Sequence, residues 1–168
     1  MDLASYPTLK LMAEDHLMYV GQKAFIEKDG KILVLMDPDM GLDFPGGKIQ
    51  IGETDFTKSL QREVREETGL EIEKGDAFYT WYTVFGPHHR NAGKLVYLVG
   101  FKCEYISGEV TLSDEHGEYR WVDESTYKKF DDGSEYFKAL EKYFSTFSGT
   151  TMKNEIVESG EVRNEGIF

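Results

Sequence analysis

The chain has 168 residues, of which 40% are apolar and 14% aromatic, so it can bury one globular core. Its formal net charge of −12 repels polyanions, which argues against bulk nucleic-acid or anionic-membrane binding. A small phosphorylated ligand stays compatible if cations screen it. No apolar run approaches the roughly 20 residues of a membrane span, and no signal-peptide pattern opens the chain, so we expect a soluble, cytoplasmic protein.

The first half of the domain reads as strands. Residues 1–17 show no clear pattern, and two apolar runs follow at 19–27 and 31–36. Asp29-Gly30 lies between these runs and is a strong signal for the turn of a β-hairpin. Residues 42–45 predict a short edge strand, because a proline lacks the N–H donor that a central strand needs.

A helix follows, with Thr54 or Asp55 as N-cap and Gly69 as the expected stop after Thr68. Residues 71–86 are rich in aromatic and β-branched side chains and predict extended structure, and residues 94–105 predict a second long strand. A polar loop at 113–117, a short strand at 118–122 and an amphipathic helix over 134–147 complete the pattern.

These elements predict a mixed β-sheet covered by helices on its faces, in an α/β domain spanning residues 18–147. Residues 148–168 are polar, dotted with glycine and without periodicity, so we expect a flexible or loosely docked tail that offers a surface for partner contacts. The sequence does not indicate the oligomeric state, and it is compatible with a homodimer. The single cysteine, Cys103, lies in an apolar run and is interpreted as a buried, unreactive thiol.

The helix over 55–68 crowds three carboxylates on one side. With Glu63 at zero on a helical wheel, Glu67 falls near about 40° and Glu66 near about 300°. The apolar stripe overlaps this arc, since it consists of Phe56, Leu60 and Val64 at about 20°, 60° and 100°. Like charges at these spacings cost roughly 0.2–0.5 kcal/mol per pair. Such an arrangement is explained either by a solvated acidic face or by a divalent cation bound to oxygen ligands.

The turn before the helix favours the cation. Two glycines, Gly46 and Gly47, follow Pro45 and allow bare backbone to come close to the acidic residues. A backbone carbonyl at this turn would then add one more oxygen ligand to those of the helix.

These residues resemble the box of the Nudix hydrolases, G-x5-E-x7-R-E-U-x-E-E-x-G-U, in which U is a bulky aliphatic residue. Gly47 and Glu53 match its first part, and Arg62 through Leu70 match its second part without exception. Eight residues, not seven, separate Glu53 from Arg62. The extra residue falls before the helix, where it does not rotate the glutamates relative to one another. The resemblance covers roughly residues 18–147.

The resemblance implies a Nudix α/β/α sandwich and Mg²⁺- or Mn²⁺-dependent hydrolysis of a nucleoside diphosphate linked to a moiety X. It implies that Glu63, Glu66, Glu67 and the Gly47 carbonyl bind the metal. Arg62 would anchor the box through Glu53.

The general base and the substrate contacts stay open. Either a box glutamate or Glu115 in the loop over 113–117 would act as base, with Glu118 and His116 behind it. Candidate substrate contacts each have a plain alternative: Lys48 as a surface lysine, Tyr79, Trp81 and Phe85 as core packing rather than base stacking, and His88, His89 and Arg90 as solvated loop residues.

Nucleoside triphosphates, nucleotide sugars, ADP-ribose and dinucleoside polyphosphates all fit the box, because the box sets the reaction and other loops choose the ligand. The main alternative is a Nudix-fold binding or regulatory module without catalysis. Such a module usually lacks a box glutamate, whereas this chain has all of them. An isomerase on the same scaffold would need a cysteine in its site, and Cys103 is expected to be buried.

Overall fold

The computed structural model describes residues 16–87 and 92–147, and its first element is the predicted hairpin. β1 (Tyr19–Lys28) pairs antiparallel with β2 (Lys31–Asp37). Asp29 and Gly30 both have positive φ, 52° and 72°, which is the turn geometry that matches the twist of paired strands. The sequence prediction is confirmed here. The segment 1–15, the loop residues 88–91 and the predicted tail 148–168 lie outside the described residues.

The sheet has six strands in the order β3-β2-β1-β5-β4, with β6 pairing on β2. Only β1 and β5 run parallel, so the sheet is mixed, as predicted. The remaining strands are β3 (Gly41–Asp43), β4 (Glu71–Val84), β5 (Leu95–Ser107) and β6 (Glu118–Val122). β4 bends at register shifts beside Lys74 and Ala77 but stays one long strand.

The predicted edge strand at residues 42–45 is wrong in its end point. β3 stops at Asp43, because the Phe44 N–H donates to the Asp43 carboxylate at 2.7 Å and Pro45 has no N–H to offer a neighbouring strand. The chain after Asp43 leaves β3 and crosses towards β1, where Ala24 N donates to the Pro45 carbonyl at 2.8 Å.

Helix α1 (Phe56–Thr68) begins and ends where its caps predict. The Asp55 carboxylate accepts from the N–H groups of Thr57 and Lys58, both at 3.1 Å. Gly69 ends the helix in the left-handed region with φ 71°. Helix α2 (Glu135–Phe147) is preceded by a short 3-10 turn, Tyr127–Phe130.

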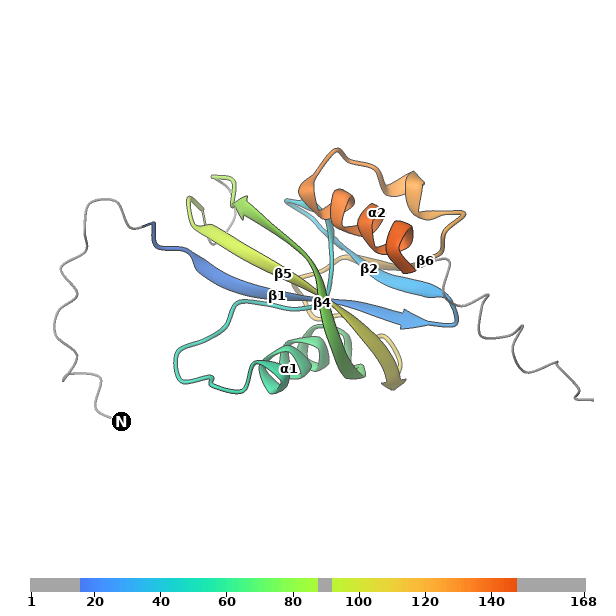
Figure 1. The fold of residues 1–168 in the computed structure, drawn as a ribbon, viewed down its shortest axis with the longest axis horizontal. Helices are drawn as coiled ribbons and strands as arrows, with labels where there is room; N and C mark the ends of the chain where they lie inside the picture. Colours follow the sequence, from blue (N-terminus) through green and yellow to red (C-terminus); the bar gives the residue numbers. More distant parts are fainter. Residues whose placement is uncertain (1–15, 88–91, 148–168) are drawn as a thin grey trace, which may run out of the picture.

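The two helices cover opposite faces of the sheet, as Figure 1 shows with α1 below and α2 above the strands. The α1 side buries a mainly aliphatic cluster of Ala24, Ile26, Leu33, Leu35, Leu60, Val64, Leu70, Ile72 and Cys103. The α2 side buries a cluster dominated by aromatic rings, including Phe25, Phe44, Trp81, Tyr136, Phe137, Tyr143 and Phe144. This is the predicted α/β/α sandwich. Cys103 is fully buried, and burial raises the pKa of its thiol to about 12, in line with the expected unreactive thiol.

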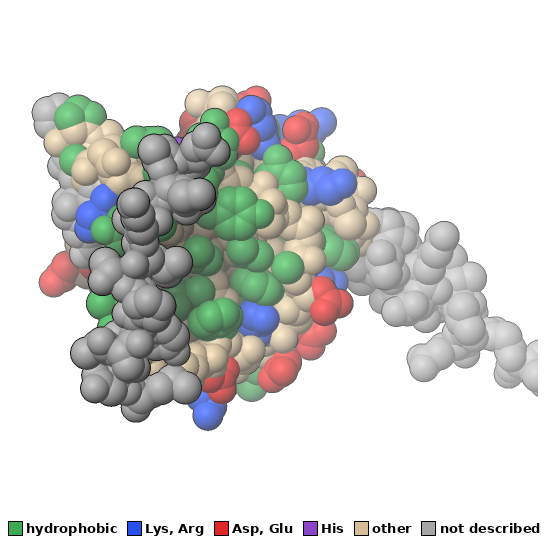
Figure 2. Space-filling model, turned by 60° about the vertical axis from the view of Figure 1, so that its left-hand side comes forward, with side chains coloured by type: hydrophobic (Ala, Val, Ile, Leu, Met, Phe, Trp, Pro, Cys, Tyr) green, Lys and Arg blue, Asp and Glu red, His purple; other side chains and the backbone are tan. Residues whose placement is uncertain are grey.

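Part of the surface is apolar, and Figure 2 shows a face on which hydrophobic side chains gather. Three exposed apolar side chains lie on neighbouring strands: Val20 on β1 pairs in register with Tyr97 on β5, and Tyr97 pairs with Tyr82 on β4.

Within residues 16–87 and 92–147, neither helix has the length and apolar character that crossing a bilayer requires.

Candidate active site

A cavity of about 500 Å³ opens where the loop after β3 meets the acidic side of α1. The ionisable side chains of its lining include three box carboxylates, and they are Lys23, Asp37, Asp43, Lys48, Glu63, Glu66, Glu67, Glu115 and His116. Its apolar lining includes Met40, Phe85, Val96 and Leu98. Most of the predicted site residues therefore meet around one space.

Glu67 is the most enclosed of the three box carboxylates. It is 8% exposed, and its Oε2 accepts a hydrogen bond from the Gly46 N–H at 2.8 Å. Burial raises the pKa of Glu67 to about 7, against the opposing attraction of the Lys23 ammonium. A second positive charge at this position would favour its ionised form.

Arg62 holds the other acidic groups of the box together. Its guanidinium donates to Glu53 Oε1 and to Glu63 Oε1, both at 2.8 Å, and to Glu66 Oε2 at 2.9 Å. The Arg62 guanidinium thus offsets the repulsion among the three carboxylates that it contacts.

The extra residue between Glu53 and Arg62 does not separate these two side chains. Glu53 lies before the helix, and its carboxylate also accepts from Gln50 N at 2.8 Å and from Ser59 Oγ at 2.7 Å. These hydrogen bonds, with that of Arg62, lower the pKa of Glu53 to about 2. α1 is one continuous α-helix over residues 56–68, so the spacing of the helical carboxylates is unaffected.

The two glycines are needed for close approach. A Cβ on Gly47 would lie 2.6 Å from the Glu63 carboxylate, and a Cβ on Gly46, whose φ is 129°, would lie 2.2 Å from the Gln22 carbonyl oxygen. The Gly47 carbonyl accepts from Gln22 N at 2.9 Å and keeps a second lone pair. Carboxylate and carbonyl oxygens side by side are the donor set of Mg²⁺ and related hard cations, so these residues fit such an ion.

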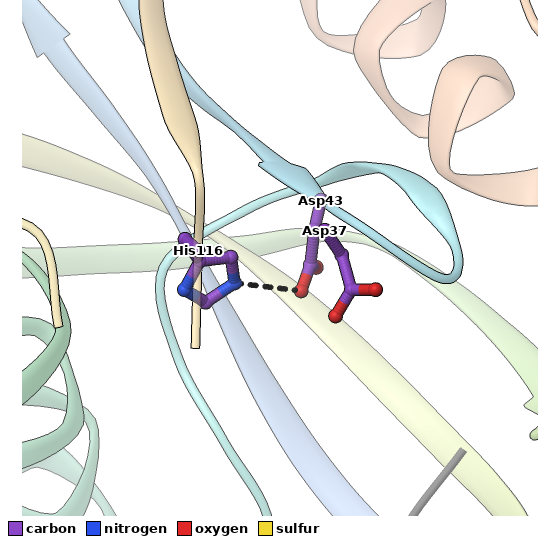
Figure 3. A group of neighbouring side chains, drawn as sticks. All are labelled: Asp37, Asp43 and His116. Atoms are coloured by element: carbon purple, nitrogen blue, oxygen red, sulfur yellow. Dashed lines mark ion pairs between the residues drawn. The ribbon is translucent and has the colours of Figure 1, made fainter. Parts of the chain in front are cut away.

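A different trio of acidic and histidine side chains also clusters at the cavity. Ligand atoms of Asp37, Asp43 and His116 lie within 4.8 Å of one another, and Figure 3 shows the His116 ring facing the Asp43 carboxylate. Nε2 of His116 is 3.5 Å from Asp43 Oδ2. The Lys23 ammonium, however, already lies 2.7 Å from Asp43 Oδ1. The Asp43 carboxylate is thus already paired with an ammonium, as the Glu63 and Glu66 carboxylates are with the Arg62 guanidinium.

The loop over 113–117 brings two predicted candidates to the cavity in different ways. Glu115 lines the cavity and is exposed, whereas His116 is 6% exposed and turned inwards. Although burial opposes it, the hydrogen bond with Asp43 raises the pKa of His116. Glu118, the third candidate, begins β6 and is absent from the cavity lining.

Some of the predicted substrate contacts line the cavity, and others lie in the aromatic core. Lys48 lines the cavity, with its ammonium 5.8 Å from the centre of the Phe85 ring, which also lines it. Trp81 is 4% exposed and packs edge-on against Tyr136 at 5.4 Å, so it belongs to the aromatic core and not to the cavity wall. Tyr79 packs against the same core, stacked on Trp81 at 6.1 Å. Arg90, with His88 and His89, lies outside the described residues.

Sequence reasoning missed Lys23, Asp43 and Asp37. One signal was present: the pair Gln22-Lys23 interrupts the buried stretch of β1 over residues 21–26, which otherwise has no polar side chain. A polar pair at such a position requires buried partners, but nothing in the sequence identifies them.

Comparison with known proteins agrees with this architecture. The sequence profile described as the NUDIX domain matches residues 23–143. A MutT-like protein of Streptomyces ambofaciens is 30% identical over 98 residues, which cover 58% of this chain and 58% of that protein. The match thus spans less than two thirds of that relative.

Solved structures share the fold. The MutT protein of Methanosarcina mazei Go1 superposes with a TM-score of 0.63 at 27% identity, over 77% of this chain and 94% of that one. An Ap4A hydrolase of C. elegans superposes with a TM-score of 0.61 at 20% identity, over 80% of this chain and 99% of that one. At the latter identity the likeness concerns the fold alone.

Proposed function

We propose a function from the premise that this chain belongs to the NUDIX domain family, whose profile covers residues 23–143. The chain is a pyrophosphohydrolase that depends on a divalent cation, Mg²⁺ or Mn²⁺. Its substrate is a nucleoside diphosphate linked to a moiety X. Water attacks one phosphorus, the bridging P–O bond breaks, and the products are a nucleoside monophosphate and phosphorylated X.

One observation carries this proposal: three carboxylates of α1 and the Gly46-Gly47 backbone border a single cavity. Glu63, Glu66 and Glu67 would hold the cation, together with the Gly47 carbonyl. A bound divalent cation neutralises phosphate oxygens and lowers the pKa of water. Arg62 touches the carboxylates rather than the cavity and would keep them grouped.

Two further residues have proposed parts in the reaction. Lys48 lines the cavity and would pair with a phosphate oxygen of the substrate. Glu115 borders the same cavity and would accept the proton of the attacking water as general base. If a box glutamate takes that proton instead, Glu115→Gln will change turnover little.

The cavity also supports a nucleotide as the substrate class. Beside the carboxylates its wall carries the apolar side chains of Met40, Phe85, Val96 and Leu98, against which a flat base can pack. The phosphates would then point towards α1 and Lys48.

The experiment is a panel of nucleoside triphosphates, nucleotide sugars, ADP-ribose and dinucleoside polyphosphates with Mg²⁺ or Mn²⁺. Products are identified by chromatography and phosphorus NMR, for the wild type and for Glu115→Gln. We expect a monophosphate from at least one substrate, only with the metal. Thermal stabilisation by a nucleotide without any turnover would instead identify a binding module, and would overturn the hydrolase.

A further inference from the structure

Lys23 is a buried charged residue that the proposed reaction does not use directly. It lies in the middle of β1 and is 7% exposed, between Gln22 at 3% and Ala24 at 0%. Taking an ammonium and a carboxylate out of water is costly, and apolar replacements of such pairs are often neutral or stabilising. Stability alone is therefore a poor explanation for a lysine at this position.

The ammonium of Lys23 contacts a single short segment, residues 43–46. It lies 2.7 Å from Asp43 Oδ1 and donates to the Phe44 carbonyl at 2.9 Å and to the Gly46 carbonyl at 3.2 Å. An ammonium has three N–H donors, so these contacts occupy it although it lines the cavity. It is poorly placed to bind a substrate and well placed to hold the chain between Asp43 and Gly46.

The backbone of β1 holds the same segment from either side. Ala24 N donates to the Pro45 carbonyl at 2.8 Å, and Gln22 N donates to the Gly47 carbonyl at 2.9 Å. Lys23, between these two residues, adds side-chain donors for the carbonyls that the backbone does not reach. The turn is thereby fixed to the sheet at each of its four residues, 44–47.

That turn contacts the carboxylates directly. Gly46 N donates to Glu67 Oε2 at 2.8 Å, and Gly47 lies against the Glu63 carboxylate, as its missing Cβ shows. A shift of the turn would therefore move the Gly47 carbonyl relative to α1 and remove the hydrogen bond that orients the Glu67 side chain. Small displacements of this kind are costly where several oxygens must meet one ion.

We propose that Lys23 is a positioning residue: its ammonium fixes the turn over 44–47, and through it the Gly47 carbonyl and the Glu67 carboxylate, in the arrangement that binds the cation. This inference rests on the proposed function for its catalytic consequence. The effect on the turn itself does not depend on any substrate.

The test compares Lys23→Met with the double variant Lys23→Met/Asp43→Asn. The single variant leaves the Asp43 carboxylate buried without its partner and is expected to fold poorly. The double variant removes both charges and is expected to fold, so it carries the test. Lys102→Met is the control, because Lys102 also pairs with a carboxylate, that of Glu27 on β1, and neither residue lines the cavity.

For the double variant we expect the Mn²⁺ dissociation constant, measured by electron paramagnetic resonance of the free ion, to rise about 10–100-fold. We expect kcat to fall by about the same factor with little change in KM. Hydrogen exchange of the Gly46 amide should become faster, while amides of the β4–β5 ladder keep their wild-type rates. Lys102→Met should match the wild type in all of these.

Three results would overturn the inference: wild-type Mn²⁺ affinity in the folded double variant, unchanged exchange at Gly46, or a raised KM at wild-type kcat, which would make Lys23 a substrate contact. If the wild type hydrolyses nothing, the proposed function fails on its own. Faster Gly46 exchange with weaker Mn²⁺ binding would then still support the positioning of the turn.

Discussion

Helices α1 and α2 each span 13 residues and cover opposite faces of one sheet, yet they bury different side chains (Figure 1). α2 buries Tyr136, Phe137, Ala139, Leu140, Tyr143 and Phe144. α1 buries only Ser59, Leu60, Val64, Glu67 and Thr68. One helix is packed almost wholly by rings and aliphatic groups, and the other brings a carboxylate into the core with two aliphatic residues.

The difference separates stability from chemistry. On the α2 face, Phe25 and Phe44 stack at 4.0 Å between ring centres, and Tyr143 stacks on Phe25 at 5.7 Å. Such ring contacts stabilise the fold beyond the burial of apolar area alone. On the α1 face, a carboxylate, that of Glu67, occupies a buried position in place of an apolar side chain. Burial raises the pKa of this carboxylate, and a bound cation would favour its ionised form. We therefore expect substitutions on the α1 face to lower kcat, and substitutions on the α2 face to lower stability without changing kcat.

The largest expected effect is that of Glu67→Gln. Turnover with Mg²⁺ should fall by about 100-fold or more, because the variant loses an anionic ligand of the proposed ion. The fold should survive, since a glutamine oxygen can still accept from the Gly46 N–H. Steady-state kinetics and thermal melting measure the two quantities.

The melting temperature of Glu67→Gln without metal should equal or exceed that of the wild type, because the amide avoids the cost of a buried carboxylate. Millimolar Mn²⁺ should raise the melting temperature of the wild type more than that of the variant. Wild-type turnover in Glu67→Gln, or equal metal shifts in both proteins, would contradict the division between the faces.

The next effect uses a matched pair of buried leucines. Leu140 on α2 and Leu60 on α1 are both 0% exposed. Either one changed to Ala should lower the free energy of unfolding by about 2–5 kcal/mol, through lost transfer energy and a residual cavity. Urea unfolding measures this loss.

The two leucines should differ in kinetics. Leu60 Cδ1 lies 3.2 Å from the position that a Cβ on Gly46 would occupy, so Leu60→Ala loosens the support of the turn and should lower kcat. Leu140→Ala should leave kcat per folded molecule unchanged, because Leu140 does not line the cavity. Equal losses of kcat in both variants would mean that the two faces are not separable.

Much of this comparison was readable from the sequence. Asp55 and Gly69 bound α1 because their cap preferences are local, and the stripe of Leu60 and Val64 follows from helical periodicity. The Asp29-Gly30 hairpin is equally local. The box spacing predicted which carboxylates share the cavity, because residues three and four apart on a helix are neighbours whatever the rest of the chain does.

What escaped prediction depends on distant pairings. Lys23, Asp43 and His116 meet although 20 and 73 residues separate them along the chain, and only the strand order brings them together. The burial of Trp81 was unpredictable for the same reason. Alternation along the strand predicts that Trp81 and Tyr79 lie on the same face of the sheet, but it does not predict which helix covers that face. α2 does, so the indole lies in the core.

The smallest expected effect concerns acid. The folded-state pKa of Glu53 is about 2, lowered from about 4.5 first by the hydrogen bond from Gln50 N and then by Ser59 and Arg62. A lowered pKa means that the unfolded chain binds the proton more tightly. The stabilisation from Glu53 is therefore complete above pH 4.5 and is lost as the pH falls towards 2. It belongs to the α1 face, where the ion pairs of the box lie.

Glu53→Gln should accordingly be less stable than the wild type at pH 7, and the gap should narrow as the pH falls from 5 to 3. Urea unfolding of both proteins at several pH values measures it. Leu140→Ala serves as the control from the other face, since its deficit involves no titrating group and should stay constant over the same range. If the Glu53→Gln gap is equally constant, the carboxylate contributes no linked proton. Its contact with Arg62 would then hold the loop through geometry alone.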